Sequence, residues 1–492
     1  MNHTTKTTIH TAAKWSSLTE LLAKLITPVI NMILARLLLP DAFGAAAAIT
    51  MVISFAELFT DAGFQKYLIQ HEFPDSRSLE DSTDAAFWSN LTVSAVLTFV
   101  IFLFRHPIAR LIGNPGLGNA VGVSSLLILI AAFSGIPTAR FRRSMDFRTL
   151  FYVRLGTALL PLPVTVPAAF VLRDYRALLI GTFGSQLFSA VFLTVRSGWK
   201  PSFRFSFAQL KEMLSFSVWT MLESISVWMT SYAGVFLVAN ELNAHYLGLY
   251  KTSMATVNGF MAIITGAVTP VLFSALSRYQ KEEAAFRDTF FFFQRITALF
   301  VLPMGIGLFV YRDLATRILL GKAWAEAGDF IGWWGLSGAF TIVFSHFSSE
   351  VYRSKGDPKR SLLLQLLHLA FLVPALLLSV PHGFDALCLA RSLIRIQSIL
   401  TSLLVLHVRY GFRLPDVLRS VFPMFLSACL MGIAGYGMKS LSPSIVWQVL
   451  SVFFCVLLYF SLLLLFPELR RKFKTIILKQ RKLFSATRNK PL

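Results

Sequence analysis

Long apolar runs separated by short polar connections are the dominant pattern of this sequence. About fourteen runs approach the roughly 20 residues that an α-helix needs to cross a bilayer. They lie near residues 16–39, 42–64, 86–104, 117–139, 150–171, 177–195, 214–238, 246–275, 290–310, 328–352, 361–380, 384–406, 417–438 and 444–466. The connections, such as NPGLGN and SKGDPKR, hold proline, glycine and charge. The pattern predicts an all-α polytopic membrane protein with about fourteen transmembrane helices.

Composition supports a membrane protein. The 492 residues are 55% hydrophobic and 14% charged, whereas soluble domains are about 25% charged. The three cysteines, Cys388, Cys429 and Cys455, lie inside apolar runs without the spacing of a metal site or a disulfide framework. The N-terminus lacks the basic segment, short apolar core and cleavage site of a signal peptide, so we expect the first span to be retained.

The distribution of basic residues predicts the orientation. With the N-terminus inside, 31 of the 46 lysine and arginine residues fall in segments predicted inside and 8 in segments predicted outside. By the positive-inside rule both termini should be cytoplasmic. The net charge of +21 is thereby explained without nucleic acid, and the basic tail 467–492 is expected to lie on anionic lipid headgroups.

The sequence contains a weak internal repeat. A constant offset of 204 residues aligns Trp15 with Trp219 and Gly44 with Gly248, and it also aligns Ala35 with Ala239. Each stretch reads as a long span, a short turn and a second long span. Repeated halves with the substrate between them near the midplane are a common transporter plan.

The repeat leads to a division of the chain into four parts. We expect an N-terminal lobe of six helices in 1–200 and a C-terminal lobe of six helices in 201–410, around a central cavity. An extra helix pair should follow in 411–466, and the cytoplasmic tail in 467–492.

Polar residues form stripes along four of these apolar spans. Residues at i, i+4, i+7 and i+11 share one face of a helix. The stripes are Glu20, Lys24, Thr27 and Asn31 in the first span, Thr50, Ser54, Glu57 and Asp61 in the second, Thr220, Glu223, Ser224 and Ser231 in the seventh, and Lys251, Asn258 and Thr265 in the eighth. We infer that these four spans line a wet interior.

The candidate substrate cavity combines the cations and amides inside the spans. It comprises Lys24, Asn31, Arg36, Arg154, Lys251, Asn258 and Arg295. Alternatives remain for some members: Lys24 can pair with Glu20 one helical turn away, and Arg36 can anchor on headgroups. Arg391 and Arg395 form a second cationic face, whose partner is either Asp385 or lipid phosphate.

Carboxylates inside spans are unfavourable unless they meet water, a partner or a substrate. The candidates are Glu20, Glu57, Asp61 and Glu223. Two roles stay open for them: coupling to an ion, or structural pairing. For Glu57 and Asp61, the available partners are Lys24, Arg36 and Lys66.

Motifs of catalysis are missing from the sequence. It has no Walker-type phosphate loop, HExxH, CxxC or GxSxG. We therefore expect a transporter rather than an enzyme, with no cofactor and no metal. Its energy would come from an ion gradient, a substrate gradient or downstream consumption.

Several short stretches resemble one family. They are ARLLLPDAFG at 35–44, DAGFQKYLIQ at 61–70, RFRRSMDF at 140–147, WKPSFRFS at 199–206, YLGLYKTS at 246–253, PVLFSALS at 270–277, LLGKAWAEA at 319–327 and YRSKGDPKR at 352–360. In this order and spacing they resemble Wzx-type flippases of the colanic-acid-exporter branch. These flippases belong to the multidrug/oligosaccharidyl-lipid/polysaccharide exporter superfamily. The last ~130 residues are similar only as apolar spans.

The resemblance implies a two-lobed transporter of the bacterial inner membrane. It would flip undecaprenyl-pyrophosphate-linked oligosaccharide units for lipopolysaccharide, capsule or exopolysaccharide by alternating access, with a cationic cavity for the pyrophosphate. Its partners would be this lipid-linked substrate, membrane lipids, and a polysaccharide polymerase with its chain-length regulator. Nucleic acid is not expected.

Three other functions remain open from the sequence. A peptidoglycan lipid-precursor flippase would also carry pyrophosphate. A cation-coupled drug exporter of the same superfamily would favour anionic cavity residues, against the lysines and arginines found here. A polysaccharide polymerase or ligase would need a large outside loop, and the longest predicted outside loop is short.

Overall fold

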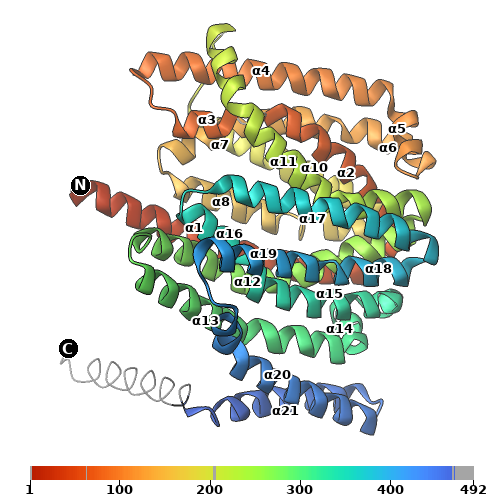
Figure 1. Ribbon diagram of the computed structural model, residues 1–492. Helices are drawn as coiled ribbons and strands as arrows, with labels where there is room; N and C mark the ends of the chain where they lie inside the picture. The colour runs from red at the N-terminus through yellow and green to blue at the C-terminus, as the bar shows by residue number, and fades with distance from the viewer. Residues whose placement is uncertain (1–2, 62–63, 203–206, 468–469, 471–492) are drawn as a thin grey trace, which may run out of the picture.

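The computed structural model describes residues 3–61, 64–202, 207–467 and 470, and shows only helices and their connections in that part of the chain (Figure 1). The first half contains α1 (His3–Leu37), α2 (Pro40–Asp61), α3 (Phe64–Gln70), α4 (Ser76–Leu103), α5 (Arg105–Leu111), η1 (Pro115–Leu117), α6 (Gly118–Ser124), α7 (Leu126–Arg143), α8 (Phe147–Leu159), α9 (Thr165–Leu172) and α10 (Tyr175–Ser197). The predicted all-α class is confirmed.

The second half is also built of helices and ends in a final pair. It contains α11 (Phe207–Glu241), α12 (Ala244–Arg278), α13 (Glu283–Val310), α14 (Arg312–Leu319), η2 (Lys322–Ala327), α15 (Gly328–Thr341), the π-helical η3 (Ile342–His346), α16 (Ser348–Ser354), α17 (Pro358–Ser379), η4 (Val380–His382), α18 (Phe384–Leu393) and α19 (Arg395–Tyr410). The pair is α20 (Leu414–Leu441) and α21 (Ile445–Leu463).

Each of the fourteen predicted spans falls on helix. Within the described residues, 11 helices are long and apolar enough to cross a membrane, which makes this a multi-span membrane protein. The other three predicted spans are α1, α8 with α9, and α15 with α16. The helix is interrupted between α8 and α9, where Pro161 and Pro163 cannot donate backbone hydrogen bonds. The total of fourteen spans stays a prediction.

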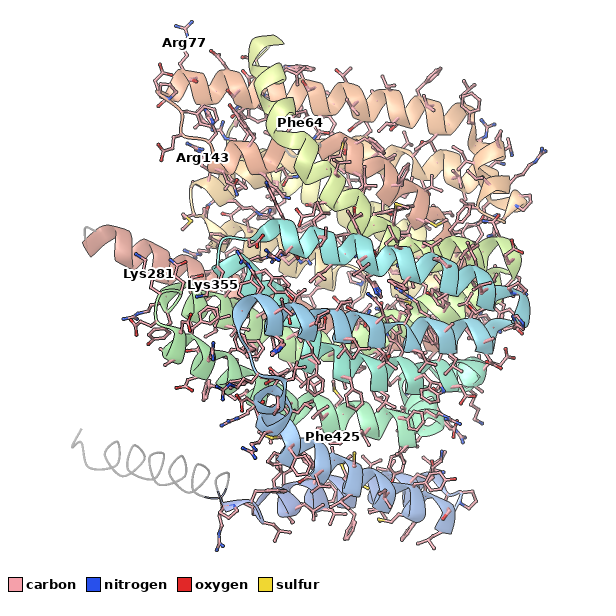
Figure 2. The ribbon with its side chains drawn as sticks, in the orientation of Figure 1. Phe64, Arg77, Arg143, Lys281, Lys355 and Phe425 are labelled. Atoms are coloured by element: carbon pink, nitrogen blue, oxygen red, sulfur yellow. The ribbon has the colours of Figure 1, made fainter. Side chains whose placement is uncertain are left out.

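The start of α1 and the end of α21 mark one end of the bundle. α1 begins and α21 ends at the same end, on the left of Figure 1. Arg77, Arg143, Lys281 and Lys355 also lie at this end (Figure 2), and all four belong to connections that we predict to be inside. We call this the terminal end. The opposite end is called the crossing end, because α2 crosses α12 there.

Residues that the sequence repeat aligns form a contact between the two halves. A Cβ on Gly44 would lie 1.8 Å from the carbonyl oxygen of Ala244, and a Cβ on Gly248 would lie 1.8 Å from that of Pro40. The offset of 204 residues relates Gly44 to Gly248 and also Pro40 to Ala244, so each contact is the counterpart of the other. The helices α2 and α12 therefore meet in a pseudo-twofold arrangement. Only glycine allows the two backbones to approach this closely.

Two further contacts at the crossing end involve residues that the offset relates, Ala35 and Ala239. Trp324 Nε1 donates a 2.7 Å hydrogen bond to the carbonyl oxygen of Ala35 in the other half. Gly113 packs against the backbone of Ala239, and a Cβ there would lie 2.0 Å from its carbonyl oxygen. Ala35 and Ala239 are again related by the offset, so the repeat marks the points where the halves join.

Two features extend beyond the simple two-lobe plan. Met213 of α11 packs in one cluster with Phe64 and Ile136, so α11 contacts the first half as well as the second. The final pair is anchored on α13 and α14, where Tyr311 Oη donates a 2.8 Å hydrogen bond to Ser451 Oγ. The exact lobe boundaries stay a prediction.

Candidate functional site

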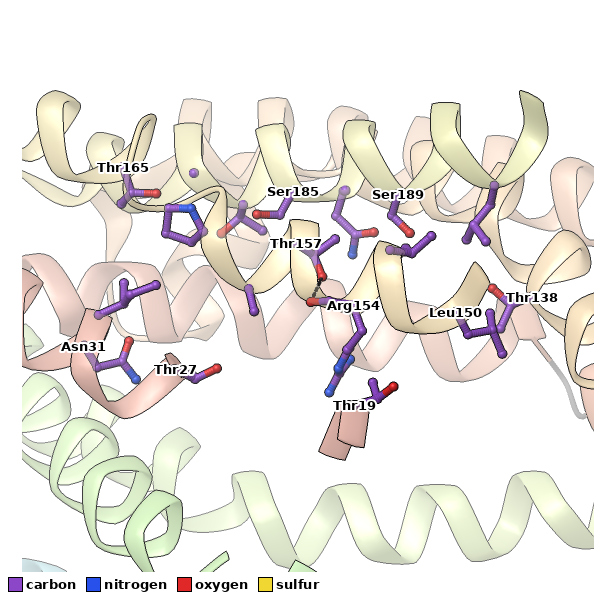
Figure 3. Close-up of a pocket in the computed structure, with 18 of the residues that line it drawn as sticks. Thr19, Thr27, Asn31, Thr138, Leu150, Arg154, Thr157, Thr165, Ser185 and Ser189 are labelled. Atoms are coloured by element: carbon purple, nitrogen blue, oxygen red, sulfur yellow. Dashed lines mark hydrogen bonds between the residues drawn. The ribbon is translucent and has the colours of Figure 1, made fainter. Parts of the chain in front are cut away.

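A cavity of about 710 Å³ opens among α1, α8 and α10 of the first half (Figure 3). Hydroxyl and amide groups dominate its polar lining, and two arginines contribute the charge. The polar lining residues are Thr19, Thr27, Asn31, Thr138, Arg142, Arg154, Thr157, Thr165, Thr182, Ser185, Gln186 and Ser189. Such a surface offers many donors and acceptors to a neutral polar ligand and a cationic position to an anionic one.

Helix α8 carries Arg154 into this cavity. Its start is fixed by Asp146, whose carboxylate accepts hydrogen bonds from the Thr149 backbone N–H at 3.1 Å and the Thr149 hydroxyl at 2.7 Å. Two turns later Arg154 extends from α8 toward Thr19 of α1 (Figure 3). The exposed guanidinium has no described carboxylate partner, so it is free to meet a ligand.

Helix α10 supplies the largest polar face of the cavity. Gly181, Thr182, Ser185, Gln186 and Ser189 follow helical spacing along one side of it. This face was missed in the sequence, where only the first, second, seventh and eighth spans showed stripes. The i, i+3 and i+4 spacing of these residues was the signal that could have found it.

In the second half, the predicted stripe of α12 carries polar contacts. Asn258 is exposed near the middle of this 35-residue helix, and its Oδ1 accepts a 3.0 Å hydrogen bond from Trp334 Nε1. Lys251, two turns away, is half-buried with its Nζ 4.2 Å from the ring centroid of Tyr232. The aromatic faces partly replace the water that these groups give up.

Two further cations complete a group in the second half. Arg391 is 5% exposed and donates a 3.0 Å hydrogen bond to the carbonyl oxygen of Thr230. The Arg395 guanidinium lies 3.1 Å from the centroid of the Trp334 ring and donates to the Trp334 carbonyl oxygen at 3.1 Å. Arg391 also lies over this ring, at 5.4 Å. We call Lys251, Arg391 and Arg395 the cation group.

The cation group has no anionic partner within the described residues. None of its members forms an ion pair with a carboxylate, including Asp385, the partner considered from the sequence. Nε of Arg391 is buried without any hydrogen-bond acceptor. Buried cations without counter-charge are unfavourable by several kcal/mol. An anion bound beside them would therefore be strongly stabilised.

The remaining predicted cavity cations lie elsewhere. The ammonium of Lys24 lies beside Gly266, where α1 packs on α12. Arg36 lies at the crossing end and donates a 2.8 Å hydrogen bond to the carbonyl oxygen of Ile318 in the other half. Arg295 is half-buried on α13, apart from the cavity lining. Of the predicted set, the structure brings Asn31 and Arg154 to the cavity and Lys251 into the cation group. Asn258 is bonded to Trp334, the ring on which the cation group stacks.

Two of the four predicted carboxylates, Glu57 and Glu223, have described side chains. Glu57 is half-buried on α2, and Glu223 is half-buried on α11. Neither forms an ion pair with a described residue, so the expected pairing of Glu57 with Lys24, Arg36 or Lys66 is not seen there. The side chains of Glu20 and Asp61 lie outside the described part of the structure. Both open roles for these carboxylates stay predictions.

Comparison with known proteins places this chain in a family. Residues 33–329 match the family described as polysaccharide biosynthesis protein. The chain is 24% identical to the succinoglycan biosynthesis transport protein ExoT of Rhizobium meliloti, over 64% of this chain and 63% of ExoT, which is less than two thirds of that protein. It is 23% identical to the teichuronic acid biosynthesis protein TuaB of Bacillus subtilis, over 88% of this chain and 89% of TuaB.

Solved structures show the same fold. The lipid II flippase MurJ in an inward closed conformation matches with a TM-score of 0.74 at 14% identity, over 92% of this chain and 98% of MurJ. An inward-facing multidrug resistance MATE family transporter of the MOP superfamily matches with a TM-score of 0.58 at 11% identity, over 78% of this chain and 97% of that one. At these identities the likeness shows the fold alone.

Proposed function

The chain belongs to the polysaccharide biosynthesis protein family. From this premise we propose that it is a flippase-type transporter of the MOP superfamily, which moves undecaprenyl-pyrophosphate-linked oligosaccharide units across the bacterial cytoplasmic membrane. The units would serve a surface polysaccharide. The proposed orientation has both termini in the cytoplasm, as the charge bias predicts. The crossing end would then face outside.

The cation group is the observation that carries this proposal. A pyrophosphate brings at least two negative charges, and guanidinium groups bind phosphate oxygens with strong, charge-assisted hydrogen bonds. Arg391 has a buried Nε without an acceptor, and no described carboxylate competes for it. A drug exporter selecting organic cations would be hindered by the same three charges.

The first-half cavity supports the oligosaccharide part of the proposal. Its threonine, serine, asparagine and glutamine side chains match the hydroxyl groups of sugars. Because the cavity holds few charges, it can exchange hydrogen bonds with a sugar without fixing it tightly. Weak, distributed contacts suit a transporter, which must also release its substrate. The prenyl tail would stay in the surrounding lipid.

Transport by this fold would require the halves to separate at one end while they stay joined at the other. The pseudo-twofold contact of Gly44 and Gly248 joins them at the crossing end in this conformation. Rocking about such a contact would expose the polar interior alternately to each side. The energy source stays open.

A deletion strain tests the proposal. We expect loss of surface polysaccharide together with accumulation of complete lipid-linked units on the inner leaflet. The intact gene should restore export, as should the Arg77→Ala variant, which removes an exposed cation at the terminal end. The Lys251→Ala variant should be inserted normally and should fail to restore export.

Other outcomes distinguish the alternatives. Accumulated peptidoglycan precursor with normal surface polysaccharide would identify a lipid II flippase, the function named for the MurJ structure. Units that reach the outer leaflet without polymerising would identify a polymerase. Changed drug sensitivity with both lipid pools normal would identify a drug exporter.

A further inference from the structure

A histidine bridges the two halves at the crossing end. His245, in the first turn of α12, places Nδ1 3.3 Å from Asp41 Oδ2, in the first turn of α2. Its Nε2 lies 3.5 Å from Glu326 Oε2 of η2. Asp41 belongs to the first half, whereas His245 and Glu326 belong to the second. The contact therefore spans the junction between the halves, one residue from the backbone contacts of Pro40 and Ala244.

Both ring nitrogens of His245 face carboxylate oxygens. A neutral imidazole has one N–H, whereas the protonated ring has two. Both nitrogens of His245 face carboxylate oxygens, so only the protonated ring donates toward both of them. The protonated ring also carries the positive charge that two carboxylates attract.

Water has access to this contact. The side chains of Asp41 and Glu326 are 62% and 64% exposed, and that of His245 is 32% exposed. Asp41 and Ala244 also line a cavity of about 450 Å³ at this end. Protons can therefore reach the imidazole from the solution on this side of the membrane without crossing the bundle.

Other ionisable groups stand on the elements that pack at this end. They include Arg36, Arg173, Asp174, Glu241, Lys322, His382 and Asp385. Arg173 and Asp174 share the 450 Å³ cavity with Asp41. Among the described residues, only Asp41 and Glu326 form an ion pair with His245. These two carboxylates therefore dominate its surroundings.

We propose that Asp41, His245 and Glu326 form a proton-dependent latch that holds the crossing end shut. Protonation of His245 ties the halves together, and loss of the proton releases Asp41 and lets the halves separate. Acidic solution at this end favours the closed arrangement, and neutral to alkaline solution favours opening. Which compartment supplies the proton follows from the proposed orientation; the latch itself does not depend on the transported substrate.

The test measures the separation of the halves directly. The full-length protein, with Cys388, Cys429 and Cys455 replaced by alanine, receives spin labels at Gly116→Cys and Ser440→Cys. Gly116 of the first half has nothing within 4 Å of a Cβ position, and Ser440 is exposed on α20 of the second half. Pulsed electron paramagnetic resonance in lipid nanodiscs then reports the distance distribution without substrate.

The latch predicts that the short-distance population rises severalfold as the pH falls from about 8 to about 5.5, the interval in which histidine changes its charge. His245→Gln should remove this dependence, and Asp41→Asn should weaken it strongly. His245→Arg should keep the closed population high at both pH values. His382→Gln is the matched control, because His382 is exposed at the same end and contacts its own helix turn, and it should leave the dependence intact.

Two results would overturn the proposal. One is a distance distribution in the parent protein that does not change with pH. The other is a pH dependence that persists in His245→Gln, which would place the titrating group elsewhere. Because substrate is left out, a failed latch says nothing about the proposed transport, and failed transport says nothing about the latch.

Discussion

The two polar regions of this protein solve different problems. The first-half cavity is wet and lined by hydroxyls and amides, with its arginines exposed at its walls. The cation group lies among α11, α12, α15, α18 and α19, with Arg391 buried and the charges stacked on the rings of Trp334 and Tyr232. In the first-half cavity, a hydrogen bond to a ligand competes with hydrogen bonds to water. In the cation group, the charges have no counter-charge among the described residues. The first region suits broad recognition of sugars, and the second suits firm recognition of an anion.

The difference arises although the two halves meet in a pseudo-twofold contact. The residue that the repeat aligns with Lys251 is Ala47, which is buried, and the residue aligned with Asn258 is Ser54. The glycines of the α2–α12 contact are kept, because backbone contact leaves no room for a side chain. The backbone contact between α2 and α12 is thus symmetric, whereas the side chains farther along the two helices differ in charge and polarity. We expect the two regions to respond differently to substitution.

Among substitutions in the two polar regions, removal of Arg391 should lower export most strongly. Arg391→Ala should lower export about 100-fold, because a buried charge-assisted hydrogen bond to phosphate is worth roughly 3 kcal/mol. Arg391→Lys should restore it only in part, since lysine lacks the planar group that stacks on Trp334. The measurement is surface polysaccharide per amount of inserted protein. Full activity of Arg391→Ala would remove the cation group from the site.

The stability of the protein should be most sensitive at the contact between α2 and α12, which joins the two halves. Gly248→Ala should destabilise the protein by about 1–3 kcal/mol or more, because its Cβ would overlap the carbonyl oxygen of Pro40. Thermal unfolding in detergent measures this. Gly437→Ala on α20, where nothing lies within 4 Å, is the matched control and should be neutral or slightly stabilising. Equal behaviour of both variants would argue against the backbone contact.

Arg154→Ala should have a smaller effect than loss of a member of the cation group. We expect export to fall about tenfold, which corresponds to about 1.4 kcal/mol, because water screens this exposed charge. Export in the complemented deletion strain is the readout, with Arg77→Ala as the control. A loss as large as that of Arg391→Ala would erase the distinction between an exposed and a buried charge.

A single hydroxyl in the first-half cavity should matter least. Ser185→Ala should lower export about twofold to fivefold, because one neutral hydrogen bond contributes roughly 0.5–1 kcal/mol. Ser440→Ala, at an exposed position on α20, should leave export unchanged. Initial export rates after induction resolve differences of this size. A null effect of Ser185→Ala would move the sugar contacts away from this face of α10.

The sequence carried enough information for the architecture. The lengths of the apolar runs located the long helices. A bilayer requires an apolar surface and a backbone whose hydrogen bonds are all made within the helix. The offset of 204 residues identified Gly44 and Gly248, and the structure explains the match as a contact between halves. Charge bias grouped the connections that the structure places at the terminal end.

The candidate site was harder to predict. Helical periodicity tells which residues share a face, but which face meets water depends on packing between helices distant in sequence. Arg391 and Arg395 were seen as a face in the sequence, yet their stacking on Trp334 joins residues about 60 positions apart. Arg36 looked like a cavity cation, and its partner, the carbonyl oxygen of Ile318, is 282 residues away. No local pattern encodes such contacts.

The most direct test of the central claim is flipping by the purified protein. Liposomes containing undecaprenyl-pyrophosphate-linked oligosaccharide are treated with a glycosidase that cannot cross the bilayer, with and without the reconstituted protein. We predict that the wild-type protein makes nearly the whole pool cleavable, whereas Arg391→Ala leaves the inner-leaflet share protected. An inner-leaflet share that stays protected in the presence of active, correctly folded wild-type protein would contradict the account.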